Sequence, residues 1–219
     1  MNLEEARRRA ENLEVTARRD RIFLNNPVVM QGLGLAPLVV AATSGQNALR
    51  LCVAAALLLT PTRMLGGQIS RAAKLSLAWR GFVYCLISSV LYIGVYQVMT
   101  LLFGVDVIQL GLYLPVLVVE PLIIKRYERP VQKERLSTAL RKGLRTTAGY
   151  CIVLLLLGCG RELLAAGSVF GHPLLQRALL PMASLPAGGF ILLGILCAVW
   201  RGAVSAYKHH VALEGRGGV

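Results

Sequence analysis

Charge and histidine are both scarce in the apolar parts of this sequence. Charged residues make up 16% of the 219 residues, hydrophobic residues make up 55%, and the three histidines all lie outside the apolar runs. A soluble domain needs a more charged surface than this, so the composition indicates an exterior that faces lipid. A signal peptide is also lacking, because residues 1–21 contain acidic side chains and arginines but no apolar core. We therefore expect an integral membrane protein with a charged amino-terminal arm that stays attached.

The five cysteines form no pattern that is typical of a metal site. Cys52, Cys85, Cys151, Cys159 and Cys197 each lie in an apolar stretch, and none belongs to a Cys-x-x-Cys pair or to a mixed cysteine and histidine spacing. A free cysteine commonly behaves as a small buried hydrophobic side chain. We therefore predict neither a metal site nor a catalytic centre in this chain.

The positive charge of the chain is high but is divided among many short segments. Lys and Arg outnumber Asp and Glu by 24 to 11, which gives a formal net charge of +13. In a soluble protein this excess would indicate a nucleic-acid partner. Here the basic residues cluster between apolar runs, where anionic lipid headgroups and the orientation rule for membrane insertion account for them. We therefore expect the lipid bilayer, and no nucleic acid, as the partner of these charges.

Six apolar runs follow the arm, and two of them are interrupted. The runs cover residues 27–44, 48–65, 81–103, 107–124, 146–159 and 186–200. The first contains Gly32, Gly34 and Pro37, and the fourth contains Pro115 and Pro121. Such residues disfavour a straight helix, and backbone groups freed at membrane depth must be covered by protein. We expect six crossings, of which the first and the fourth are broken.

The positions of the basic residues predict the orientation. If the amino terminus is cytoplasmic, only Arg50, Arg161 and Arg177 fall on the outside, and the other 21 of the 24 basic residues fall on the inside. An odd number of crossings would place one of the basic blocks on the wrong side. We therefore predict a multi-pass protein with both termini in the cytoplasm.

The first and fourth runs also resemble each other. Residues 32–40 (GLGLAPLVV) match residues 111–119 (GLYLPVLVV) after a shift of one residue at the proline. With three crossings per half, the second copy runs opposite to the first, so halves at about 27–103 and 107–205 are predicted to be inverted repeats. Chance similarity between two segments rich in leucine, valine and glycine is the alternative. The predicted domains are a basic cytoplasmic arm at 1–26, a membrane domain at 27–205 and a cytoplasmic tail at 206–219.

Three polar residues near the breaks are candidates for an ion path. Glu120 is the only acidic residue inside an apolar run, and an ionisable group there needs a partner or water. It either binds a cation or pairs with Lys125 or Arg126 near the cytoplasmic end of the run. Gln46 and Asn47 follow the first break, where they either line an ion path or cap the next helix.

Several short motifs are similar, in the same order, to those of a known membrane family. They are Asn26-Pro27-Val28-Val29, Gly34-Leu35-Ala36-Pro37-Leu38, Asn47-Ala48-Leu49, Leu112-Tyr113-Leu114-Pro115, Gly160-Arg161-Glu162-Leu163 and Leu185-Pro186-Ala187-Gly188-Gly189-Phe190. On these motifs, residues 22–205 resemble the Rnf/Nqr membrane subunits, most closely the RnfE/NqrD-like branch. Arg161 and Glu162 lie near the expected outer end of the fifth crossing, and we interpret them as an interfacial anchor.

The resemblance implies an all-α integral membrane protein of the prokaryotic plasma (inner) membrane, with six transmembrane helices as two inverted three-helix repeats. It also implies a role within an Rnf-like complex that couples electron transfer between ferredoxin or a quinone and NAD to ion translocation. The implied partners are an RnfA/NqrE-like membrane subunit and other Rnf-like subunits. In the family, each of the two paired subunits contributes two cysteines to a 2Fe–2S cluster.

At the two family cluster-ligand positions this chain has Ala36 and Pro121. Cluster binding needs thiolate or imidazole donors, which neither residue has. We therefore expect a divergent paralogue that binds no cofactor itself and is at most a non-catalytic subunit of a translocating oxidoreductase complex. The alternatives are a stand-alone small ion or solute transporter that uses Glu120 at a broken-helix midplane site, or a structural assembly subunit.

Overall fold

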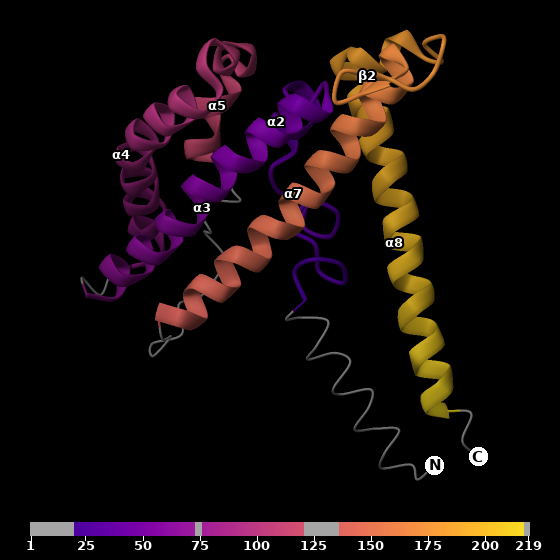
Figure 1. Cartoon of the computed structure of the whole chain (residues 1–219). Coiled ribbons are helices and arrows are strands. Elements are labelled where there is room, and N and C mark those ends of the chain that lie inside the picture. Colours follow the sequence, from indigo (N-terminus) through magenta and orange to yellow (C-terminus); the bar gives the residue numbers. More distant parts are fainter. Residues whose placement is uncertain (1–19, 73–75, 121–135, 217–219) are drawn as a thin grey trace.

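Helices make up most of the chain (Figure 1). The computed structural model describes residues 20–72, 76–120 and 136–216, so Pro121 and most of the arm predicted at 1–26 lie outside it. The helices are α2 (Leu35–Val40), α3 (Gly45–Ala72), α4 (Leu77–Phe103), α5 (Tyr113–Val116), α7 (Leu136–Ala166) and α8 (Pro186–Arg216), with 3-10 turns η1 (Gly104–Leu110), η2 (Leu117–Val119) and η3 (Pro181–Ser184). A short hairpin pairs β1 (Ser168–Val169) antiparallel to β2 (His172–Pro173).

Among the described residues, four helical segments are long and apolar enough to cross a membrane. They are Gly45–Ile69, Trp79–Leu110, Ser137–Ala166 and Pro186–His210. Within the described chain, the runs at 27–44 and 107–120 instead form turns, 3-10 turns and the short helices α2 and α5. The fold is therefore that of an all-α, multi-pass membrane protein in which two apolar runs are interrupted.

The long helices extend beyond the apolar runs from which they were predicted. The Ser44 hydroxyl accepts the Asn47 backbone N–H at 3.2 Å, which caps the first turn of α3. α3 then continues through Pro61 to Ala72. α8 continues to Arg216, so most of the segment predicted as a tail at 206–219 prolongs the last helix. Hydropathy indicates where a helix can lie in lipid, whereas backbone hydrogen bonding decides where it ends.

α3 and α7 form the central helix pair and run antiparallel. Ala48 faces Gly158 and, further along α3, Cys52 faces Cys151, which lies earlier on α7. A methyl group added at Gly158 would lie 2.6 Å from the Ala48 Cβ atom, so the two backbones approach closely there. Small residues at a helix contact permit this approach inside a membrane. In Figure 1, α4 and α8 lie on either side of this pair.

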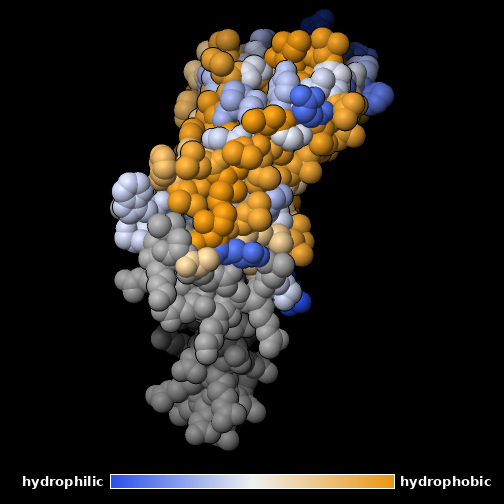
Figure 2. All heavy atoms as spheres, turned by 90° about the vertical axis from the view of Figure 1, so that its left-hand side faces the viewer, coloured by the Kyte–Doolittle hydropathy of each residue, from blue (hydrophilic) through white to orange (hydrophobic). Residues whose placement is uncertain are grey.

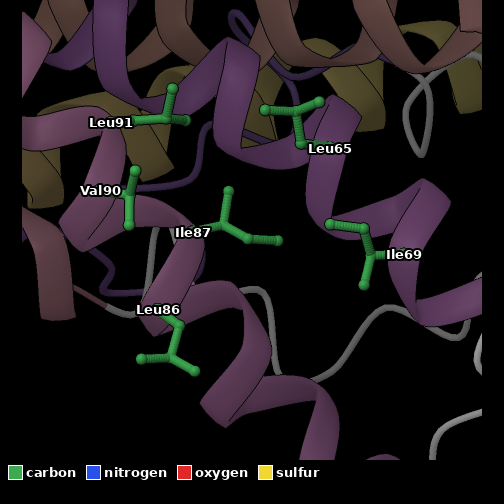
Figure 3. Close-up of a pocket in the computed structure, with 6 residues that line it drawn as sticks. All are labelled: Leu65, Ile69, Leu86, Ile87, Val90 and Leu91. Atoms are coloured by element: carbon green, nitrogen blue, oxygen red, sulfur yellow. The ribbon is translucent and has the colours of Figure 1, made fainter.

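α4 and α8 are much less covered by the rest of the chain than α3 and α7. The view toward α4 shows a broad apolar surface (Figure 2). Val90, Ile93 and Leu101 on α4 are each at least 66% exposed. An apolar groove of about 290 Å³ lies between α3 and α4, lined by Leu65, Ile69, Leu86, Ile87, Val90 and Leu91 (Figure 3). Surfaces of this kind are covered by lipid or by the helices of other subunits.

Candidate functional site

A buried asparagine holds the start of the first interrupted segment. The Asn26 side chain is fully buried, and its amide nitrogen donates to the backbone carbonyls of Ile22 at 3.0 Å and Gly149 at 2.8 Å. Its amide oxygen accepts the backbone N–H of Val28 at 2.9 Å. Both ends of the side-chain amide are therefore used, and the segment is attached to α7 before the break begins.

The break itself lies at Gly34, directly before α2. Gly34 has a φ of 74°, a left-handed conformation that residues with a side chain adopt at a cost of about 1–2 kcal/mol. A methyl group at this position would lie 2.5 Å from the Tyr150 Cε2 atom. Tyr150 is fully buried, and its hydroxyl donates to the Gly34 carbonyl at 3.3 Å. The glycine and the tyrosine ring on α7 therefore fit each other closely.

The described part of the second interrupted segment reaches Glu120, beside this break. Glu120 follows η2 in an extended conformation, as expected for a residue that precedes proline. Its side chain is buried, and its carboxylate lies near the backbone N–H of Gly34. α2 also contacts α5. The two interrupted segments thus meet, and a carboxylate lies at the amino-terminal end of α2, where the helix dipole favours negative charge.

Arg161 joins the other end of α2 to the segment that precedes α8. Its side chain is fully buried, and its Nε atom donates to the Ala183 carbonyl at 2.9 Å. One terminal nitrogen donates to the carbonyls of Val39 and Ala42, and the other donates to the carbonyls of Ser184 and Leu185. These five bonds match the five N–H groups of a guanidinium. Arg161 is therefore an internal clamp, and the interpretation as an interfacial anchor was wrong.

Glu162, the next residue on α7, makes a second connection, to the start of α3 and to the hairpin. Its carboxylate accepts the backbone N–H of Gly45 and that of Gly171, each at 2.7 Å, and the Ser168 hydroxyl at 3.0 Å. Gly45 is the first residue of α3, so the carboxylate lies at that helix amino terminus. The pair Arg161 and Glu162 therefore connects α7 to α2, α3 and the hairpin. The sequence contained a signal for this role, since two opposite charges interrupt an apolar helix.

Gln46 and Asn47 lie away from Glu120. Gln46 is exposed and donates to the Phe170 carbonyl at 3.3 Å, whereas the Asn47 amide oxygen accepts a bond from Arg50 at 2.7 Å. Arg50 also forms an ion pair with Asp106. Both residues lie at the start of α3, beyond the carboxyl-terminal end of α2, whereas Glu120 lies at its amino-terminal end. The structure therefore does not bring the three proposed ion-path residues together.

Ala36 lies in the first turn of α2 and is exposed. This exposed position faces away from the rest of the chain, next to the point where the two interrupted segments meet. A methyl group has no lone pair with which to ligate a metal. The second family ligand position, Pro121, follows Glu120 directly and lies outside the described residues.

The chain is similar to known proteins over nearly its whole length. Residues 15–197 match the model of the family described as "Rnf-Nqr subunit, membrane protein". The chain is 33% identical over 196 residues to the E component of the ion-translocating oxidoreductase complex of Shewanella denitrificans, covering 81% of this chain and 82% of that protein. It is 27% identical over 177 residues to the E component of the Na(+)-translocating ferredoxin:NAD(+) oxidoreductase complex of Acetobacterium woodii, covering 80% of this chain and 89% of that protein.

Proposed function

Because the chain belongs to the Rnf-Nqr family of membrane subunits, we propose that it is the RnfE-like component of an Rnf-like complex that couples electron transfer to ion translocation. Its partners are other Rnf subunits. The long, poorly covered helices α4 and α8 support this assignment, because they leave apolar surface for neighbouring membrane subunits. The protein is therefore a subunit that works within an assembly.

We further propose that the chain crosses the membrane six times, in two inverted halves. Each half contains one interrupted segment followed by two long helices: 27–44 with α3 and α4, and 107–120 with α7 and α8. This order supports six crossings arranged as inverted halves, with an RnfA/NqrE-like subunit facing the interrupted segments. Location in a prokaryotic plasma membrane is proposed from the family of the chain, and the distribution of basic residues supports both termini in the cytoplasm.

The residues at the family cluster position do not fit an iron–sulfur cluster. The observation that carries this conclusion is the exposed methyl group of Ala36 on α2, at the meeting point of the interrupted segments. In this function the chain shapes the ion path and holds its partner in place, and no electron-transfer step passes through a cluster that it ligates at this position.

Iron analysis tests the loss of the cluster. We expect the full chain, purified with its partner subunits, to show no iron–sulfur signal that depends on this chain. The measurement combines iron and sulfide quantification with electron paramagnetic resonance of the reduced sample. A stoichiometric, reducible cluster that disappears when this chain is removed would contradict the proposal. Isolation of the chain without any partner would favour a stand-alone transporter instead.

Replacement of Glu120 tests its place in the ion path. We expect Glu120→Gln to lower ion transport by about tenfold, equivalent to about 1.4 kcal/mol, because a carboxylate at the break attracts a cation that an amide attracts poorly. The measurement is ion uptake into proteoliposomes that contain the complex. Asp106→Asn is the comparison variant: it also removes a carboxylate, but one outside the break, so its effect shows what loss of the ion pair with Arg50 contributes. Unchanged transport by Glu120→Gln in an intact complex would exclude Glu120 from the path.

A further inference from the structure

Two cysteines face each other in the contact between the two central helices. The Cys52 thiol lies 3.6 Å from the Cys151 carbonyl oxygen, and the Cys151 thiol lies 3.8 Å from the Cys52 carbonyl oxygen. Each cysteine therefore makes the same contact with the other helix. Such a reciprocal arrangement requires the two backbones to be close.

The packing around these residues supports a short distance between the helices. Ala48 lies one turn before Cys52 and faces Gly158, which lies two turns after Cys151. These small residues allow α3 and α7 to approach closely beside the cysteine pair. A disulfide needs Cα atoms about 4.4–6.8 Å apart, a separation that only closely packed helices provide. The crossing of α3 and α7 is therefore a suitable place for such a bond.

The environment of the pair differs from that of a soluble redox site. Cys52 is 7% exposed, whereas Cys151 is partly exposed, and both lie within helices that can span a membrane. Tyr150, next to Cys151, is fully buried. Water-soluble thiol reagents reach such a position poorly, whereas an apolar oxidant dissolved in the bilayer can approach the more exposed Cys151.

We propose that Cys52 and Cys151 form an intramembrane dithiol that a membrane-soluble quinone oxidises to a disulfide between α3 and α7. In this step two S–H bonds break and one S–S bond forms. The two electrons and two protons pass to the quinone, which becomes a quinol. The product is a covalent bond between the two central helices, and reduction by a dithiol restores the two thiols.

The test uses the full chain in lipid nanodiscs together with a fully substituted benzoquinone, which has no ring position open to simple thiol addition. When the treated chain is denatured and alkylated, we expect the number of alkylatable thiols to fall from the five cysteines present to three, with one quinol formed per chain. Peptide mapping should find a single link, between Cys52 and Cys151. Because this measurement uses the unaltered chain, it does not depend on the folding of a variant.

Cysteine variants provide the controls. Cys52→Ala and Cys151→Ala are expected to keep all four remaining thiols after treatment and to form no quinol. The double variant Cys85→Ala/Cys197→Ala, altered on the outer helices α4 and α8, should still lose two thiols. Retention of all five thiols in the unaltered chain would overturn the proposal, as would a link that joins other cysteines or two separate chains.

Discussion

Arg161→Met is expected to destabilise the protein more than any other single change at a charged residue of the site. The substitution keeps an apolar stem but removes a guanidinium donor from each of five backbone carbonyls, of which that of Leu185 keeps a second donor, the Gly189 backbone N–H. Hydrogen bonds within membrane proteins average about 0.6 kcal/mol, and those to charged groups in proteins contribute about 1.5–3 kcal/mol. Loss of five such bonds therefore corresponds to about 3 kcal/mol or more. Denaturant unfolding of the detergent-solubilised chain measures this difference.

Two further variants show whether the hydrogen bonds cause the effect. Arg177→Met removes an arginine that is exposed, and we expect it to change the free energy of unfolding by less than about 0.5 kcal/mol. Arg161→Lys keeps the charge but has three donors in a different geometry, so its stability should lie between those of the unaltered chain and Arg161→Met. Equal stabilities of Arg161→Met and Arg177→Met would show that the clamp contributes nothing.

Gly34→Ala is the second change with a large expected effect. The new methyl group would adopt a left-handed conformation and would also overlap the buried ring of Tyr150, because its calculated position is 2.5 Å from Cε2. The conformation costs about 1–2 kcal/mol, and overpacking of a rigid core costs about 1–3 kcal/mol more. We expect a total loss of about 3 kcal/mol, measured by the same unfolding experiment, together with weaker assembly with the partner subunits.

Gly32→Ala separates the two contributions. Gly32 has a φ of 66°, but a methyl group there meets nothing within 4 Å, so only the conformational cost applies. Its expected loss is about 1 kcal/mol. If Gly32→Ala were as damaging as Gly34→Ala, the fit between Gly34 and Tyr150 would not be the reason for the larger effect.

The breaks in the fold could be predicted from the sequence because their causes are local. Gly34 and Pro115 restrict or release the backbone wherever they occur, so the interruptions and the four long apolar helices follow from residue type and order. Two opposite charges within an apolar helix indicated that Arg161 has a role, but its acceptors could not be predicted, because all five come from residues 39–42 and 183–185, far from it in sequence. The distribution of basic residues predicts Arg161 at a membrane surface, whereas its tertiary contacts bury it inside the protein.

The side-chain contacts of Gln46 and Asn47 could not be predicted from the sequence either. Their position after the first break correctly indicated the start of a helix, but the residue that caps the helix is the neighbouring Ser44. The partner of Asn47, Arg50, is held by Asp106 from a segment some 56 residues away. Local signals thus predicted the element, and the side-chain network that surrounds it depends on how distant segments pack.

The length of α8 has a consequence for how the protein presents itself at the membrane surface. Its 31 residues, at about 1.5 Å per residue, extend about 46 Å, whereas the hydrocarbon layer is about 30 Å thick. Unless the helix tilts strongly, about ten residues therefore project into the headgroup region and the water beyond. The exposed Lys208 lies in this carboxyl-terminal part. A water-soluble protein that docks on this side would contact the stiff, positively charged end of a helix rather than a loop.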